Sequence, residues 1–240
     1  RTVALDEVVV SESYRMRQEK LTALPVDVVR KDFLSRHFSG NLVQTLERIP
    51  GVHSMDIGAG FSKPVIRGLG FNRIAVSENG IKQEGQQWGS DHGLEIDAFN
   101  IDEVRVRKGP ASLLFGSDAM GGVIEVLPPA TPILNGLAGE AVLLGKTVNG
   151  TLGGSLMLGW KRGAWYVKGR YSEQRYGDYR VPTDTVVYLT QKMPVYGRRL
   201  KNTAGVERNA SLFSAYARGH YRMNVALSNA YQKMGFFAGA

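Results

Sequence analysis

The sequence contains no cysteine among its 240 residues. A disulfide framework, a cysteine-ligated metal site and a thiol enzyme are therefore excluded. Apolar runs are also short, and none approaches the ~18 to 20 consecutive apolar residues of a membrane-spanning helix. The opening residues, RTVALDEVVV, lack the charged start and apolar core of a signal peptide, so we expect that any export leader has been removed.

Motifs of nucleotide-binding proteins and hydrolases are missing as well. In the glycine-rich stretch KGPASLLFGSDAMGGVIEV, residues 108–126, no lysine follows the paired glycines as a phosphate loop requires, and no GxSxG elbow is present. The stretch GLGFNR at 68–73 ends in arginine where a dinucleotide-binding fingerprint has glycine. No grouping of serine, histidine and carboxylate indicates nucleophilic catalysis. We therefore expect that the protein is not an enzyme.

Glycine and positive charge, in contrast, are abundant. The chain has 29 glycines, which indicate tight turns rather than long helices, and a formal net charge of +8. Nucleic acid is the first partner that such a charge suggests. However, the basic residues are scattered, and some, such as Lys168 and Arg170, occupy alternate positions of strand-like segments. We expect no nucleic-acid partner, because a basic lumen or an anionic membrane surface explains the charge equally well.

Apolar and polar residues alternate along segments of the C-terminal half. The alternation is clear at 152–160, 165–172 and 221–231, and weaker at 139–148 and 209–218. Segments of about ten residues, with one apolar face and aromatics near the ends, are typical of transmembrane β-strands. An ordinary antiparallel sheet with one buried face shows the same alternation and stays the alternative.

Loop lengths favour the membrane interpretation. Residues 161–163 and 219–220 form short connections, whereas a much longer stretch separates 172 from 209. Outer-membrane barrels have short periplasmic turns and long external loops, so both short turns fall on the periplasmic side if 139–148 runs outward. Residues 139–240 supply only about five strands, and an open sheet edge in lipid would leave backbone groups without hydrogen bonds, so we expect the chain to be part of a longer protein.

The N-terminal half predicts a loosely held arm followed by a small α+β domain. The arm contains a β-prone run at 6–11, and Asn79-Gly80 predicts a hairpin turn. Helices are predicted over 26–36 and 39–48, the second with Ser39 as a possible cap, and strands over 65–67, 73–77 and 104–107. The expected domains are an arm at 1–24, an α+β domain at 25–132 and barrel strands at 133–240.

Several sequence blocks between residues 46 and 127 occur in the order found in the plug domain of TonB-dependent outer-membrane transporters. They are LERIPGV at 46–52, IRG at 66–68, NRI at 72–74, NG at 79–80, VRVRKGPAS at 104–112 and FGSDAMGGVI at 115–124. The chain thus resembles this family. The resemblance implies an α+β plug domain, the first antiparallel strands of a transmembrane β-barrel of about 22 strands, and location in the outer membrane of a Gram-negative bacterium.

The resemblance also implies a partner for the arm. An exposed β-prone segment can add as a strand to a partner's sheet, and in this family the partner is TonB, the energy-transducing protein of the inner membrane. A frayed terminus or a first strand of the plug is the alternative. The implied coupling residues are Asp6, Glu7, Val8, Val9, Val10 and Ser11.

Plug arginines of the family pair with barrel glutamates, which implies ion pairs for Arg67 and Lys108. Lysine lacks the fork that makes a bidentate pair, so Lys108 fits this role less well than the arginine common there. The sequence also departs from the family at Arg105, where glutamate is usual, and at Asn79, where aspartate is usual.

The stretch from 83 to 97 carries imidazole and carboxylate groups that suit zinc or a similar divalent metal. Plug loops in this region of the family face the substrate, and Asp91 with His92 resembles a pair in some zinc-uptake members, although a loop histidine is commonly just solvated. The substrate or metal candidates are His53, Trp88, Asp91, His92, Glu95 and Asp97. No cofactor is expected, and a bound metal would be a substrate.

The resemblance predicts TonB-dependent uptake of a scarce nutrient, namely zinc, siderophore-iron, haem or cobalamin. The expected partners are TonB, outer-membrane lipid and the small-molecule or metal substrate. Two rivals stay open from the sequence. One is a soluble periplasmic binding module with a plug-like fold, and the other is a metal-dependent enzyme that uses His92.

Overall fold

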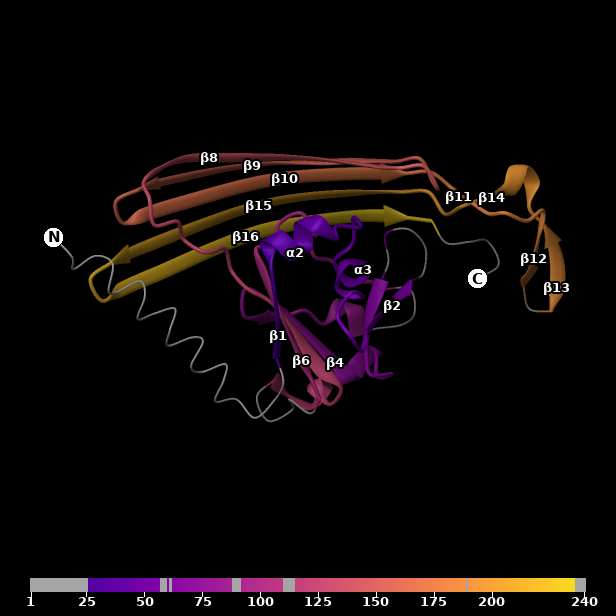
Figure 1. The fold of residues 1–240 in the computed structure, drawn as a ribbon, viewed down its shortest axis with the longest axis horizontal. Coiled ribbons are helices and arrows are strands. Elements are labelled where there is room, and N and C mark those ends of the chain that lie inside the picture. Colours follow the sequence, from indigo (N-terminus) through magenta and orange to yellow (C-terminus); the bar gives the residue numbers. More distant parts are fainter. Residues whose placement is uncertain are drawn as a thin grey trace.

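A computed structural model describes residues 26–56, 60, 62–87, 92–109, 115–188 and 190–235. These residues form two parts, an N-terminal domain and a long curved sheet (Figure 1). The N-terminal domain lies against one side of the curved sheet, which we call the wall. The arm, including the predicted coupling residues 6–11, lies outside the described residues.

The N-terminal domain is built on a five-stranded mixed sheet. Its strand order is β1-β6-β7-β4-β5, with β4 and β7 parallel and the other neighbours antiparallel. The strands are β1 (Val26–Arg30), β4 (Ile74–Glu78), β5 (Ile81–Lys82), β6 (Glu103–Lys108) and β7 (Gly122–Val126). Alternate residues of β6, such as Val104 and Val106, are fully buried in the domain core, as the period of a strand requires.

Short helices and one hairpin complete this domain. The α-helices are α2 (Lys31–Arg36) and α3 (Leu42–Leu46), and the 3₁₀ turns are η1 (Phe71–Arg73), η2 (Gly85–Gln87) and η3 (Ser117–Ala119). The hairpin pairs β2 (Val52–Asp56) with β3 (Ser62–Ile66). In these described parts of the chain, no helix is long and apolar enough to cross a membrane.

The predicted helix boundaries were wrong in two places. Residues 26–30 form β1 rather than the start of a helix, because this valine-rich segment pairs along its whole length with β6. The second helix is limited to 42–46, and its cap is Asn41 rather than Ser39. The Asn41 side chain accepts hydrogen bonds from the backbone N–H of Val43, at 2.9 Å, and of Gln44.

The remaining local predictions for this domain were close to the structure. The predicted strands at 65–67, 73–77 and 104–107 correspond to β3, β4 and β6, with boundaries that differ by a few residues. The Asn79-Gly80 turn between β4 and β5 is confirmed, since both residues have positive φ, 53° and 83°, as a type I′ hairpin turn requires.

The wall consists of five long antiparallel strands in the order β16-β15-β10-β9-β8. They are β8 (Gly136–Lys146), β9 (Thr151–Arg162), β10 (Trp165–Tyr176), β15 (Gly205–Arg218) and β16 (Tyr221–Met234). The short connections predicted at 161–163 and 219–220 lie at one end of the wall, near the N-terminal side of β10 and the C-terminal side of β15 (Figure 1).

The opposite end of the wall carries the long segment between β10 and β15. This segment contains β11 (Tyr179–Arg180), β12 (Thr185–Tyr188), β13 (Gln191–Pro194), η4 (Tyr196–Arg198) and β14 (Arg199–Leu200). It begins beside the turn between β8 and β9, where the Gly177 N–H donates to the Asn149 carbonyl at 2.8 Å. The predicted separation of the short turns from the long segment is confirmed.

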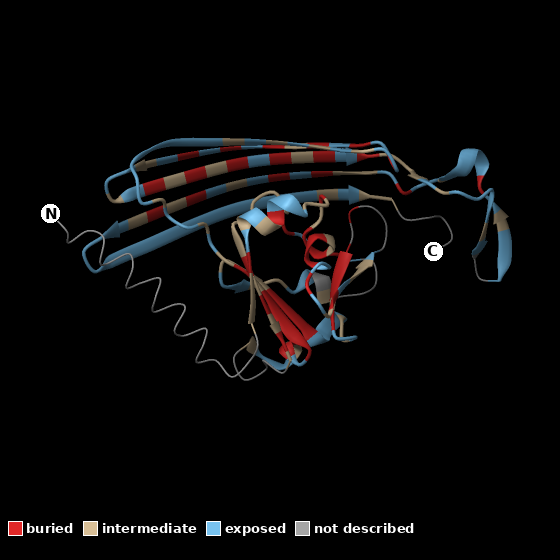
Figure 2. Cartoon of the chain, viewed as in Figure 1, coloured by how far each residue is buried: buried red, intermediate tan, exposed pale blue. Residues whose placement is uncertain are grey.

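The two faces of the wall have opposite chemistry. Along β10, buried and exposed residues alternate (Figure 2), and the buried face, turned toward the N-terminal domain, carries Lys168 and Arg170. The outer face is apolar, and Leu156 and Val225 are 56% and 46% exposed there. A water-soluble sheet would bury its apolar face, so this inside-out arrangement is that of a membrane barrel wall rather than of an ordinary sheet.

Candidate functional site

A group of charged side chains joins the N-terminal domain to the wall. From the wall, the ammonium of Lys168 lies 2.9 Å from the carboxylate of Asp102, which precedes β6. Arg170, also on β10, pairs with Glu140 of β8 at 2.7 Å. Lys31 at the start of α2 contacts Glu140 and lies 3.9 Å from Asp102. The two acids thus share three cations, and the group joins both parts of the molecule.

Burial makes this charged group costly to disrupt. Lys168 is 3% exposed and Arg170 is 4% exposed, so neither cation can be solvated where it lies. The guanidinium of Arg170 donates a second hydrogen bond to the hydroxyl of Ser155 at 2.8 Å. Removing one partner of such a buried pair leaves an uncompensated charge, which is strongly destabilising.

Asp97 lies close to the same cations. Burial raises the pKa of Asp97, while the backbone N–H of Phe99, at 3.0 Å, and the positive charges of Arg170 and Lys168 act in the opposite direction. Burial also raises the pKa of Glu78, and the neighbouring Asp97 carboxylate adds to this effect. The interface therefore contains carboxyl groups whose protonation depends on how the domain sits against the wall.

A second contact lies nearer the end of the wall that carries the long segment. There the wall side chains Lys146 and Gln174 donate hydrogen bonds to the backbone carbonyls of Ser39 and Gly40, the latter at 3.1 Å. Gln174 also donates to the carboxylate of Glu207 at 2.7 Å. The wall thus holds this loop by its main chain.

Two glycines allow this close approach. A Cβ atom on Gly40 would lie 2.9 Å from the Cδ2 atom of Leu144. A Cβ atom on Gly60 would overlap the hydroxyl of Tyr176 and a carboxylate oxygen of Glu207. Neither overlap at Gly60 is compatible with a normal contact, so a larger residue there would require the backbone at 60 or the buried side chains of Tyr176 and Glu207 to move.

The Lys168–Asp102 pair has the opposite polarity to the pairs that the family resemblance implies, because its cation is on the wall, whereas the Lys31–Glu140 pair places a cation of the N-terminal domain on a wall glutamate as implied. Lys108 pairs inside the N-terminal domain with Asp27 at 2.7 Å, because β1 pairs with β6 and places Asp27 opposite Val106, two residues from Lys108. Its implied pair with a wall glutamate is therefore not formed within the described residues. Arg67 is exposed, and its ion pair with a wall glutamate stays a prediction.

The predicted metal candidates are not brought together in the described residues. His53 on β2 is exposed, as are His92 and Glu95, while Asp97 faces the cations of the wall. Trp88 and Asp91 lie outside the described residues. No group of three or more histidine, aspartate or glutamate side chains with metal-binding geometry occurs in the part of the chain that the structure describes.

Sequence reasoning missed the acids and the glycines of the interface. Asp102 and Glu140 are far in sequence from the cations that they neutralise, and nothing local marks Gly40 or Gly60. The available signal was Lys168 and Arg170 themselves, because charges on the inner face of a strand need acidic partners when they are buried. That signal indicates that partners exist but does not identify them.

Comparisons with known proteins agree with this architecture. A family model described as "TonB-dependent Receptor Plug Domain" matches residues 18–123. The chain is 28% identical over 167 residues to the "Vitamin B12 transporter BtuB" of Photobacterium profundum, covering 67% of this chain and 27% of that protein. It is 29% identical over 109 residues to the "Iron-regulated outer membrane virulence protein" of Vibrio cholerae, covering 42% and 17%.

Solved structures share the fold at low sequence identity. "Copper transporter OprC" superimposes with a TM-score of 0.69 at 17% identity, covering 88% of this chain and 31% of that chain. The unliganded ferric citrate transporter FecA gives a TM-score of 0.67 at 22% identity, covering 90% and 32%. The chain therefore spans about a third or less of the length of these proteins.

Proposed function

Because this chain carries the plug domain of a TonB-dependent outer-membrane receptor together with five strands of its barrel wall, we propose that the whole receptor imports a metal-containing nutrient. The observation that carries this proposal is the docking of the plug (the N-terminal domain) on the polar inner face of a wall whose outer face is apolar. A folded domain held inside a barrel by polar contacts blocks the passage and can be displaced without exposing an apolar core.

The proposed mechanism couples substrate binding outside to a pull from inside. Substrate contacts the external loops and the plug, and the arm at 6–11 then pairs with TonB as an added β-strand. Force on the arm loosens the plug at its contacts with the wall. The contacts that resist this force include the Lys168–Asp102 pair and the bonds from Lys146 and Gln174 to the loop at 39–40.

The substrate class is proposed from the names of relatives and from side-chain chemistry. Relatives named for vitamin B12, ferric citrate and copper support a metal complex or cobalamin. Zinc, siderophore-iron and haem belong to the same class. Among the candidates, His92, Glu95 and His53 are exposed and accessible to a ligand, and Trp88 and Asp91 stay candidates from the sequence.

An uptake assay tests this function. The full-length receptor is expressed in a Gram-negative strain without other metal-complex receptors, and uptake of labelled cobalamin, iron complexes and zinc is measured with and without TonB. We expect uptake of one compound that requires both TonB and residues 6–11. Uptake that persists in the strain without TonB, or after deletion of 6–11, would contradict the mechanism.

Calorimetry of the purified full-length receptor separates the metal question from transport. Zinc binding that disappears in His92→Ala supports zinc as the substrate. Unchanged zinc binding in this variant removes His92 from the ligand set, and absence of zinc binding by the wild type leaves the metal complexes and cobalamin as the proposed substrates.

A soluble periplasmic module does not fit the outer face of the wall. Leu137, Leu143 and Leu152 are 85%, 89% and 72% exposed there, and a soluble protein would leave this apolar surface in contact with water. The chain instead belongs to a protein of the outer membrane, as its named relatives do.

A further inference from the structure

Three basic side chains gather on the outer face of the wall, at the end that carries the long segment. Arg175 of β10 lies opposite Val206 of β15, and Val206 lies opposite Lys233 of β16. Arg208 of β15 is two residues along from Val206. Residues that are paired across antiparallel strands share a face, so these three cations occupy one surface. We call this surface the outer basic patch.

The outer basic patch faces away from the plug. Arg175 and Arg208 are exposed, and each alternates with a buried residue of the inner face, Tyr176 and Glu207. The plug and any imported substrate lie on the inner side. A ligand of the patch therefore reaches it from outside the barrel, where the wall meets lipid.

The patch sits at the level expected for lipid headgroups. On the same face, Tyr231 lies directly opposite Arg208, and Tyr171 lies two residues nearer the middle of the wall; they are 47% and 49% exposed. Beyond these tyrosines come the apolar Leu212 and Leu227, which are paired across β15 and β16. An apolar band followed by tyrosines and charged residues is the order in which a strand passes from hydrocarbon to the headgroup layer.

The charges of the patch are not balanced by the acid beside them. Glu173 accepts hydrogen bonds from the Nε atoms of Arg175, at 2.7 Å, and Arg208, at 3.3 Å, and from the hydroxyl of Tyr171 at 2.9 Å. The patch therefore has one carboxylate, Glu173, for three cations, Arg175, Arg208 and Lys233. Because Glu173 engages both guanidiniums through Nε, their terminal amino groups stay available to an anionic oxygen.

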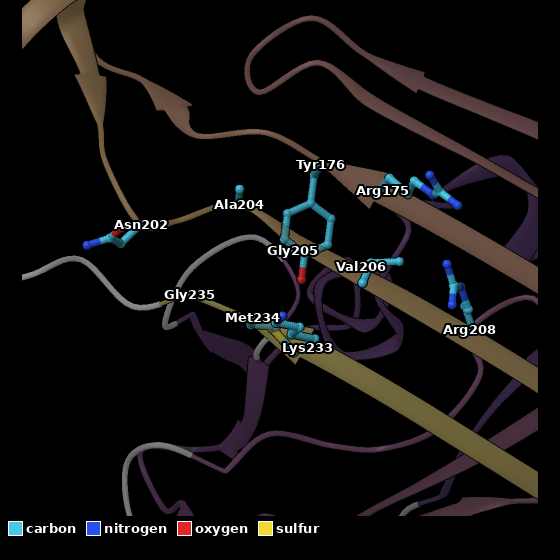
Figure 3. A pocket seen from close by; sticks show the side chains of 10 residues that line it. All are labelled: Arg175, Tyr176, Asn202, Ala204, Gly205, Val206, Arg208, Lys233, Met234 and Gly235. Atoms are coloured by element: carbon cyan, nitrogen blue, oxygen red, sulfur yellow. The ribbon is translucent and has the colours of Figure 1, made fainter.

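A cavity of about 570 Å³ opens beside the patch (Figure 3). It lies where β10, β15 and β16 end, and the outer-face residues Arg175, Arg208, Lys233 and Val206 line it together with Tyr176 and Met234 of the inner face. The volume is within the usual range for small-ligand sites, roughly 300 to 1,000 Å³. A phosphorylated headgroup can enter this cavity while its acyl chains follow the apolar band.

We propose that Arg175, Arg208 and Lys233 bind the phosphate groups of an anionic lipid in the outer leaflet of the membrane. The geometry combines a charged-oxygen site with an adjoining apolar surface, which suits a lipid better than a free anion. Guanidinium groups bind phosphate through two parallel hydrogen bonds, and the third cation adds a point charge. The lipid would anchor the strands from which the long external segment leaves the wall.

Native mass spectrometry of the full-length receptor in neutral detergent tests this proposal. The probe is lipid A carrying two phosphates, and the comparison ligands are dephosphorylated lipid A and inorganic phosphate. The variant Arg175→Gln with Lys233→Gln removes two cations of the patch. The matched control, Arg162→Gln with Arg218→Gln, removes two cations at the opposite end of the wall.

Removing two patch cations that face anionic phosphate groups is expected to weaken lipid A binding about 30-fold. The control variant is expected to bind lipid A as the wild type does. Dephosphorylated lipid A should bind the wild type as weakly as lipid A binds the patch variant. The charge-keeping variant Arg175→Lys with Lys233→Arg should retain most of the affinity, which separates loss of charge from misfolding.

Three outcomes would overturn the proposal. The first is equal loss of affinity in the patch variant and in the control. The second is equal binding of phosphorylated and dephosphorylated lipid A by the wild type. The third is competition by inorganic phosphate at the same concentration as the lipid, which would identify a site for a free anion instead.

Discussion

Asp102→Asn provides the sharpest test of how the plug is held, because it removes the carboxylate that neutralises Lys168. The ammonium of Lys168 is 2.9 Å from Asp102, and Lys168 is 3% exposed. Breaking a buried pair from one side typically costs about 3 to 5 kcal/mol. Asp102 is 25% exposed, so water can partly replace it, and we expect plug docking to lose about 2 to 3 kcal/mol.

The reverse substitution, Lys168→Met, should cost less, about 1 kcal/mol, because Asp102 is partly solvated and keeps Lys31 at 3.9 Å. The double variant leaves no buried charge without a partner and should recover part of the loss. The coupling energy between the two sites, measured by the double-mutant cycle, is therefore expected to be about 1 to 2 kcal/mol.

Urea unfolding of the plug in the full-length receptor measures these changes, with a fluorophore on a cysteine introduced at the exposed Glu84 as reporter. The matched control is Asp32→Asn, which breaks an exposed pair with Arg36 at 4.0 Å and should change stability by less than about 0.5 kcal/mol. If Asp102→Asn changes stability no more than this control does, the pair does not hold the plug and our reasoning is wrong.

Three further predictions use the same unfolding measurement. Gly60→Ala should destabilise docking by about 1 to 2 kcal/mol, because its Cβ would overlap the hydroxyl of Tyr176. The control Gly85→Ala, whose Cβ would have nothing within 4 Å, should have no such cost. Equal effects of the two variants would refute the close fit of Gly60 against the wall. The pKa of Asp97 in the docked plug is raised above its ordinary 3.8, so the docked state binds a proton more tightly than the unfolded state does. The stability of the docked plug should therefore fall as pH rises from about 3.8 to the raised pKa and then level off. The variant Asp97→Asn should reduce this pH dependence. Asn79→Ala should cost about 1 kcal/mol at φ 53°, while Asn79→Gly should be tolerated, and equal loss in both would show that backbone strain is not the cause.

The wall was predictable because its signal is local. A period of two along a strand decides which residues share a face, and the apolar and polar faces of 152–160 and 165–172 are read directly from neighbouring residues. The Asn79-Gly80 turn was predictable for the same reason, since its positive φ angles are a property of these two residues.

The errors arose where pairing with distant strands decides the structure. Residues 26–30 could continue into the helix at 31–36, and only the pairing with β6 makes them a strand. The partner of Lys108 follows from the same pairing. The Lys168–Asp102 contact joins residues far apart in sequence, so it depends on how the domain docks on the wall, which no local pattern contains.

The loop at 39–40 is held by its carbonyl groups, and every peptide unit has a carbonyl whatever its side chain. The hydrogen bonds from Lys146 and Gln174 therefore depend on the backbone path of the loop and not on its side chains. Evolution can replace the residue at Ser39 without changing this contact, while Gly40 and the two wall residues are constrained. A plug taken from a related receptor should dock on this wall as long as its corresponding loop keeps the same backbone path and a glycine at the position of Gly40.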